Sequence, residues 1–179
     1  TVQVKVVDAT GNALGPSETG EVCITGPILM AGYWNKPEAT AEAIDPDGWL
    51  HTGDVGHLDE DGYLFITDRM KDMIIRGGEN IYCVEIEQRL VSHPGIADAA
   101  VIGVPHPELG EEVKAVVQVE SGVTLTEGEV RTWVADALAA FKVPTYVEVR
   151  TERLPRNASG KLLKNLLRGE GVVSFSETM

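Results

Sequence analysis

The spacing of apolar side chains changes along the chain, and this change constrains the fold more than any other feature of the sequence. Near the start, Val2, Val4 and Val6 alternate with polar residues, and residues 21–25 repeat the alternation after a stretch rich in Gly and Pro. A two-residue period is typical of a strand with one buried face. The segments VGHL and YLFIT flank the sequence DEDG and predict a β-hairpin. We therefore expect the first part of the chain to be rich in β-structure.

Helices and strands alternate in the prediction for the second part. Thr126 with Glu129 forms a capping-box pattern that predicts a helix through Ala140. The other predicted helices of this part begin near residue 84 and at the SGKLL segment, and its predicted strands are 73–75, 99–104, 113–119 and 146–150. In the first part, one short helix is predicted to begin at Pro37. The expected fold class is α+β. A charged strip at 68–72 divides a β-rich part, 1–70, from a small α+β domain, 71–179.

Charge and composition exclude several classes of function. The 15 Lys and Arg against 28 Asp and Glu give a net charge of −13, which opposes binding to nucleic acid or anionic lipid. No apolar run approaches the roughly 20 residues of a membrane-spanning helix. The two cysteines, 60 positions apart, provide neither a disulfide framework nor a zinc knuckle, so a reducing cytoplasm is the expected compartment.

The sequence WLHTGD at 49–54 places a carboxylate directly after a glycine. An ionised Asp only accepts hydrogen bonds and has two oxygens, so Asp54 is suited to the two vicinal hydroxyls of a ribose. A plain turn or edge-strand residue is the alternative. A metal site of His51, Asp54 and His57 is disfavoured because positions 51 and 57 of an extended strand share a face, whereas position 54 points the other way. We therefore predict no metal ligands.

Two further segments carry more charge and glycine than the fold alone requires. In DRMKDMIIRGGEN, Arg69 either pairs with a phosphate or ribose oxygen or belongs to a solvated linker. Gly77 and Gly78 permit a close backbone approach, or they form a tight turn between a strand and a helix. In LPRNASGKLL, Lys161 is either a surface charge or a cation that reaches an anionic site on another domain.

Common catalytic motifs are missing from the sequence. A phosphate-binding GxxxxGK loop fails at LPRNASGK because Pro155 takes the place of its first glycine and Leu162 follows the lysine. GxSxG, CxxC and the Gly-rich dinucleotide fingerprint are all absent. The residues alone therefore describe a two-part chain with candidate nucleotide contacts.

Three long segments resemble, in order and spacing, the closing third of the adenylate-forming enzymes, most closely the fatty-acyl-CoA synthetases. The segments are GPILMAGYWNKPEAT, DGWLHTGDVGHLDEDGYLFITDRMKDMIIRGGENIY and LPRNASGKLL. This resemblance implies an acid–thiol ligase, in which a carboxylate attacks the α-phosphate of ATP to give acyl-AMP and pyrophosphate. The thiol of coenzyme A then displaces AMP to give a thioester.

The resemblance also implies roles for individual residues. Asp54 holds the ribose hydroxyls, Arg69 contacts the nucleotide, and Lys71 is the hinge of the small domain. Lys161 enters the site for the first half-reaction, and Gly77 and Gly78 line the path of the pantetheine arm in the second. Residues 1–70 are expected to end the large AMP-binding domain as a fragment of its β-barrel, and 71–179 to form the mobile small domain.

The remaining expectations concern what the chain lacks and which enzymes are its alternatives. The loop that grips the ATP phosphates, most of the Mg²⁺ site and the acyl pocket are expected upstream, so the chain is expected to be a piece of a longer protein and inactive in isolation. The alternatives are a fatty acyl-AMP ligase that loads a carrier protein and a non-catalytic nucleotide- or CoA-binding module. Cys83 stands where the family usually has proline. Lys161 also resembles lysines that acetyltransferases modify, which would remove its charge. The carboxylate, its chain length, the acceptor and the oligomeric state are left open.

Overall fold

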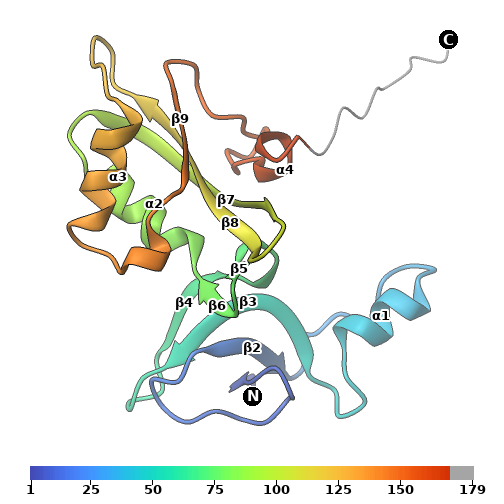
Figure 1. The fold of residues 1–179 in the computed structure, drawn as a ribbon. Helices are drawn as coiled ribbons and strands as arrows, with labels where there is room; N and C mark the ends of the chain where they lie inside the picture. Colours follow the sequence, from blue (N-terminus) through green and yellow to red (C-terminus); the bar gives the residue numbers. More distant parts are fainter. Residues whose placement is uncertain (170–179) are drawn as a thin grey trace, which may run out of the picture. The chain divides into compact units, whose positions relative to one another are not determined.

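The computed structural model describes residues 1–169, and its contacts divide the chain into two compact units, Thr1–Lys71 and Asp72–Met179 (Figure 1). Each unit has its own β-sheet. Together they have the predicted α+β composition. No helix in residues 1–169 has the length and apolar character needed to cross a bilayer.

The first unit is an antiparallel four-stranded sheet in the order β1-β2-β3-β4. Its strands are β1 (Gln3–Val7), β2 (Gly20–Thr25), β3 (Leu50–Leu58) and β4 (Leu64–Arg69). Val2 and Val4 are exposed, whereas Val6 is buried, because β1 is an edge strand that is covered only towards its end. The helix α1 (Pro37–Ala43) begins at its proline, as predicted.

Register shifts interrupt the pairing of this sheet at two places, and a side chain supports one of its turns. The pairing of β2 with β3 shifts register between Glu21 and Cys23, and that of β3 with β4 shifts at Val55. The predicted hairpin turn joins β3 to β4, and its Asp59 Oδ1 accepts hydrogen bonds from the N–H groups of residues 61 and 63. The Asp59 side chain therefore adds to the backbone hydrogen bonds that close the turn, Asp59 N–H to the Tyr63 carbonyl and Gly62 N–H to the Asp59 carbonyl.

The second unit contains a five-stranded sheet in which β6-β5-β8-β7 form the main order and β9 also pairs with β8. The strands are β5 (Ile74–Arg76), β6 (Glu79–Ile81), β7 (Ile96–His106), β8 (Gly110–Val119) and β9 (Tyr146–Arg150). β7 and β8 are antiparallel over most of their length, and β9 runs parallel to β8. β5 meets only the start of β8, where Arg76 pairs with Gly110.

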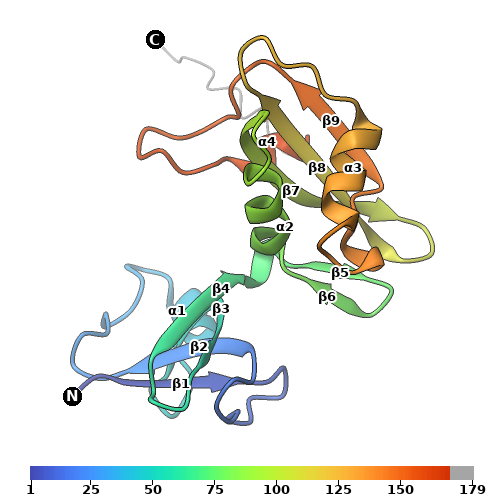
Figure 2. The same ribbon diagram turned by 90° about the vertical axis from the view of Figure 1, so that its left-hand side faces the viewer.

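Both faces of this sheet are covered. Helices α2 (Cys83–Val91) and α3 (Glu127–Ala135) lie on one face, and α4 (Lys164–Leu167) lies on the other (Figures 1 and 2). On β7, Val101 packs in the core beneath α2 and α3, while Ala100 belongs to a smaller cluster with Leu154 and Leu162. Burial on both faces explains why the β7 sequence AAVIGV is apolar without alternation.

The structure differs from the sequence prediction in several elements: β7 and β8 are longer than predicted, and larger differences concern α3, β6 and α4. α3 ends at Ala135 instead of Ala140, because residues 137–143 pack their apolar side chains on the core in irregular and 3-10 conformation (η2, Ala140–Lys142). Strand β6 was not predicted. The last helix begins at Lys164 instead of near Lys161, because the preceding residues pair with each other: Leu163 N–H donates to the Pro155 carbonyl.

Candidate functional site

Asp54 and Arg69 lie side by side in the first unit. They are register partners on β3 and β4, and Arg69 Nε donates to Asp54 Oδ1 over 2.8 Å. The side chains are 46% (Arg69) and 30% (Asp54) exposed, so both are accessible to a ligand. Both residues are predicted from the sequence to contact a nucleotide, and the structure places them next to each other. A carboxylate has about four lone-pair sites, so the pair leaves Asp54 capacity to accept hydroxyl donors.

Residues 51–54 form a bulge inside β3, the HTGD turn, which the neighbouring strand β2 holds in place. Gly53 has φ +69°, in the left-handed region, and its N–H donates to Glu21 Oε1 over 3.2 Å. Thr52 Oγ1 donates to the Val22 carbonyl and accepts from the Asp54 N–H. Sequence reasoning missed Glu21 and Thr52 because both act through pairing between β2 and β3.

His51, Cys23 and Glu21 form a cluster beside this turn. Glu21 Oε2 lies 2.7 Å from His51 Nδ1, and Cys23 Sγ lies 3.6 Å from the same nitrogen. Burial, and then the Glu21 charge, raise the pKa of the Cys23 thiol to about 11, so it is protonated at neutral pH. Thiol and imidazole are poor ligands for Mg²⁺, which prefers oxygen, so this cluster does not fit the Mg²⁺ of an ATP complex. His57 has a different role and stacks on Phe65.

Gly77 and Gly78 form the two-residue turn of the β5–β6 hairpin. Their φ angles are +58° and +88°, and Arg76 pairs with Glu79 across the turn. A two-residue turn with both φ values positive matches the twist of a hairpin and favours Gly-Gly. The sequence predicted that this turn joins a strand to a helix. In the structure it joins β5 to a second strand, β6, which precedes α2, so that part of the prediction is wrong. Gly77 N–H also donates to the Leu109 carbonyl.

A buried ion pair supports this glycine hairpin. Arg76 Nε donates to Glu112 Oε1 over 2.6 Å, and the Glu112 side chain is 4% exposed. Burial by itself raises the pKa of Glu112, but the hydrogen bonds from Arg76 and from the Val113 N–H outweigh it and hold the pKa below its usual value. Cys83, in the proline position, is fully buried and its thiol donates to the Asp72 carbonyl over 2.8 Å.

Lys161 lies on a closed turn that its own segment builds. Arg156 pairs with Leu162 across the turn, and Asn157 N–H donates to the Lys161 carbonyl over 2.9 Å. The Asn157 side-chain oxygen accepts from the Lys161 N–H over 2.8 Å and from Ser159. The sequence predicts a Ser-Gly turn at this position, and the structure adds Asn157, whose side chain closes the turn. The backbone at Lys161 is thus fixed while its side chain is exposed.

Ion pairs on both sides tie the Lys161 turn to the second unit. Before it, Arg156 bonds to Asp98 over 2.6 Å and to the Gly160 carbonyl. After it, Lys164 Nζ lies 2.8 Å from Glu87 of α2. Burial lowers the pKa of Lys164, but the neighbouring Cys83 and Glu87 raise it by more, so this lysine is charged at neutral pH.

Lys161 differs from the other cations of its unit. In residues 72–169, Lys161 and Arg153 are the two cationic side chains that contact neither a carboxylate nor an aromatic ring. An acidic surface offers many carboxylates, so an ordered lysine left without one is available for an anion from outside.

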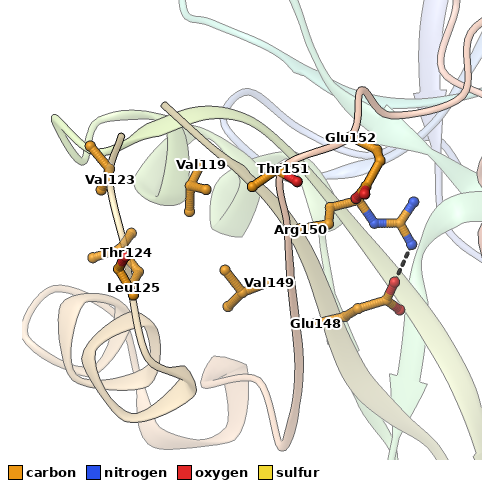
Figure 3. A pocket seen from close by; sticks show the side chains of 9 residues that line it. All are labelled: Val119, Val123, Thr124, Leu125, Glu148, Val149, Arg150, Thr151 and Glu152. Carbon is orange, nitrogen blue, oxygen red and sulfur yellow. Dashed lines mark hydrogen bonds and ion pairs between the residues drawn. The ribbon is translucent and has the colours of Figure 1, made fainter. Parts of the chain in front are cut away.

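A separate open pocket lies between the end of β9 and residues 123–125 (Figure 3). Its walls are apolar near Val119 and Val149, and its charged rim holds the Arg150–Glu148 ion pair (Figure 3). The hydrogen bonds from Lys114 and Arg150 lower the pKa of Glu148. None of the residues that the sequence singled out lines this pocket.

Comparison with known proteins identifies the family. Residues 85–161 match the AMP-binding enzyme C-terminal domain. A feruloyl-CoA synthase of an Amycolatopsis species is 48% identical over 165 residues, which are 92% of this chain and 33% of that protein. A fatty acid–[acyl-carrier-protein] ligase of Streptomyces coeruleorubidus is 46% identical over 93% of this chain and 32% of its own length. The chain thus spans about a third of the length of these curated relatives.

A solved structure gives the same result. The ATP-bound crystal structure of MatB from Rhodopseudomonas palustris is 42% identical, with a TM-score of 0.89, over 94% of this chain and 33% of that one. The apo form of the same protein matches 94% of this chain and 34% of that one, with a TM-score of 0.66 at 43% identity, so its two solved forms differ over this region. Residues 85–161 therefore form the C-terminal domain of the AMP-binding, or adenylate-forming, enzyme family, and the similarity to the relatives extends over nearly the whole chain.

Proposed function

We propose that the protein to which this chain contributes is an ATP-dependent acid–thiol ligase that activates a fatty acid as acyl-AMP and transfers the acyl group to coenzyme A. The observation that carries this proposal is the exposed, unpaired Lys161 on a turn whose backbone is fixed by Asn157. A fixed cation suits the first half-reaction, in which a carboxylate and a phosphate, both anions, must approach. Removal of one such electrostatic contact typically costs about 10²- to 10³-fold in rate.

Asp54 and Arg69 are proposed to hold the nucleotide. Asp54 would accept the ribose hydroxyls, and Arg69, which is bonded to Asp54, would contact the nucleotide. ATP with Mg²⁺ is the proposed co-substrate. The donors near this turn do not suit Mg²⁺, so we expect the ion to bind outside residues 1–169.

The two half-reactions are proposed to use different edges of the second unit. Lys161 would act in the first, and the side-chain-free turn at Gly77 and Gly78 would line the pantetheine path in the second. Two observations support a hinge at Lys71: the contacts divide the chain between Lys71 and Asp72, and one relative differs between its ATP-bound and apo forms. The assignment of residues 1–70 to the end of a large domain belongs to this proposal.

A carrier protein is the second candidate acceptor. One relative of 46% identity is a fatty acid–[acyl-carrier-protein] ligase by name, and both acceptors present a phosphopantetheine thiol. Assays of the full-length protein with coenzyme A and with a phosphopantetheinyl carrier distinguish them, since only the true acceptor should give a thioester.

The test of the proposal is fatty-acid-dependent release of pyrophosphate by the full-length protein. We expect activity in the wild type, a loss of about 10²-fold or more in Lys161→Ala, and near wild-type activity in the matched variant Arg153→Ala. Acetylation of Lys161 should suppress activity in the same way because it removes the charge. We also expect the 179 residues alone to be inactive. Equal activity of Lys161→Ala and wild type would refute the proposal.

A further inference from the structure

We infer that Glu21 is a positioning residue that holds Asp54 in place for the ribose, an inference that rests on the role proposed for Asp54. Glu21 lies on β2, 33 positions before Asp54 in the sequence, and no motif that includes Asp54 contains it. Its carboxylate nevertheless reaches the turn from which Asp54 projects.

Glu21 bonds to the turn at two points. Oε2 lies 2.7 Å from His51 Nδ1, and Oε1 accepts from the Gly53 N–H over 3.2 Å. Its side chain is 17% exposed, so these bonds are largely shielded from water. A shielded carboxylate with two partners binds them more strongly than a neutral acceptor does. Glu21 therefore bonds the two direct neighbours of Thr52, His51 and Gly53, and Gly53 is the residue before Asp54.

The turn requires this restraint because of its glycine. Gly53 has φ +69°, and an added Cβ would find open space, so the local packing does not hold this conformation. Glycine also has the largest backbone freedom of any residue. The hydrogen bond from the Gly53 N–H to Glu21 favours this conformation of Gly53, and Asp54 is the next residue in the chain.

The other support of Asp54 is weaker. Arg69 Nε bonds to Asp54 Oδ1, but the two side chains are 46% and 30% exposed, and exposed ion pairs contribute little rigidity. Arg69 must also reorganise when a nucleotide binds. The backbone of Asp54 is bonded to Thr52 Oγ1, which is itself anchored on β2. The backbone at Asp54 thus depends on contacts to β2, and Glu21 supplies the charged one of these contacts.

The test compares ATP with 2′,3′-dideoxy-ATP in the full-length protein. If Asp54 reads the ribose hydroxyls, the wild type should have a higher kcat/KM for ATP. Glu21→Ala should lower kcat/KM for ATP by about tenfold and leave that for the dideoxy analogue nearly unchanged, because a displaced Asp54 no longer discriminates. Glu21→Gln retains an acceptor for the Gly53 N–H and should keep most of the discrimination.

Glu18→Ala is the matched control. Glu18 also accepts a glycine N–H, from Gly15 over 2.6 Å, but among the described residues no hydrogen bond or ion pair joins it to residues 51–54, so its loss should leave the ratio unchanged. Equal losses for both nucleotides in Glu21→Ala, or an unchanged ratio, would overturn the inference for Glu21 alone. A wild type that uses both nucleotides equally would overturn the ribose role of Asp54, and this inference with it. Should Glu21→Ala fail to fold, His51→Ala, which removes one of the two partners of Glu21, decides by the same ratio: the discrimination should fall, and a ratio equal to that of the wild type would overturn the inference.

Discussion

Replacement of Arg76 by Met should destabilise the second unit strongly and in a pH-dependent way. Met keeps most of the side-chain volume but leaves Glu112, whose side chain is 4% exposed, without its cation. The folded protein can respond by protonating Glu112. At pH 7 this costs about 1.4 kcal/mol for each pH unit above an ordinary pKa of about 4.3, or about 3.7 kcal/mol in total. The Val113 N–H still donates to the carboxylate, so we expect a loss of about 2 to 4 kcal/mol.

The sign of the pH dependence follows from the two pKa shifts. In the wild type the pKa of Glu112 is lowered, so its contribution to stability is present above the ordinary pKa and is lost as the pH falls through the lowered one. In Arg76→Met the pKa of Glu112 is raised, so the variant becomes relatively more stable as the pH falls. At pH 5 protonation costs only about 1 kcal/mol, and the deficit should shrink accordingly.

Urea unfolding of wild type and variant at pH 7 and pH 5, followed by circular dichroism, measures these free energies. Arg131→Met removes an exposed ion pair with Glu127 and is the matched control, with an expected loss of about 0 to 1 kcal/mol at either pH. Glu112→Gln added to Arg76→Met should restore part of the loss at pH 7 because it removes the buried charge. A loss below about 1 kcal/mol at pH 7, or one that does not change with pH, would refute the reasoning.

Three further stability predictions concern the second unit, all measurable by thermal unfolding. Gly77→Ala should cost about 1 kcal/mol because φ is +58°, whereas Gly128→Ala inside α3 should be neutral or stabilising; the reverse order would contradict this. Thr126→Ala should cost about 1 kcal/mol by removing the capping box, and no change would argue against that box in solution. Lys164→Met should cost about 2 kcal/mol or more, because Glu87 loses a largely buried partner, and adding Glu87→Gln should restore part of it.

Features with local causes could be read from the sequence. The Asp59 turn, the capping box at Thr126 and the start of α1 at Pro37 each depend on a few neighbouring residues, and all three are confirmed. Features that depend on contacts between separate segments of the chain could not be predicted from the sequence. Strand β6 is three residues long and forms because β5 lies beside it, and α3 ends early because its following residues pack on a shared core.

In the candidate site, too, some residues could be predicted from local motifs, whereas others act through contacts with residues far away in the sequence. Asp54, Arg69, Gly77, Gly78 and Lys161 stand out by residue type and motif. The residues that hold these segments in place do not stand out in the sequence. Glu21, Glu112 and Glu87 act from other strands or helices and resemble ordinary surface acids. A net charge of −13 makes such functional carboxylates especially hard to distinguish from solvated ones.

The separation of the two half-reactions tests the central claim most directly. In the full-length protein, acyl-AMP formation from fatty acid and ATP and thioester formation from supplied acyl-AMP and coenzyme A are measured separately for wild type and Lys161→Ala. The account predicts that acyl-AMP formation falls by about 10²-fold or more while thioester formation stays within a few-fold of wild type. Equal loss of both half-reactions, or of neither, would contradict it.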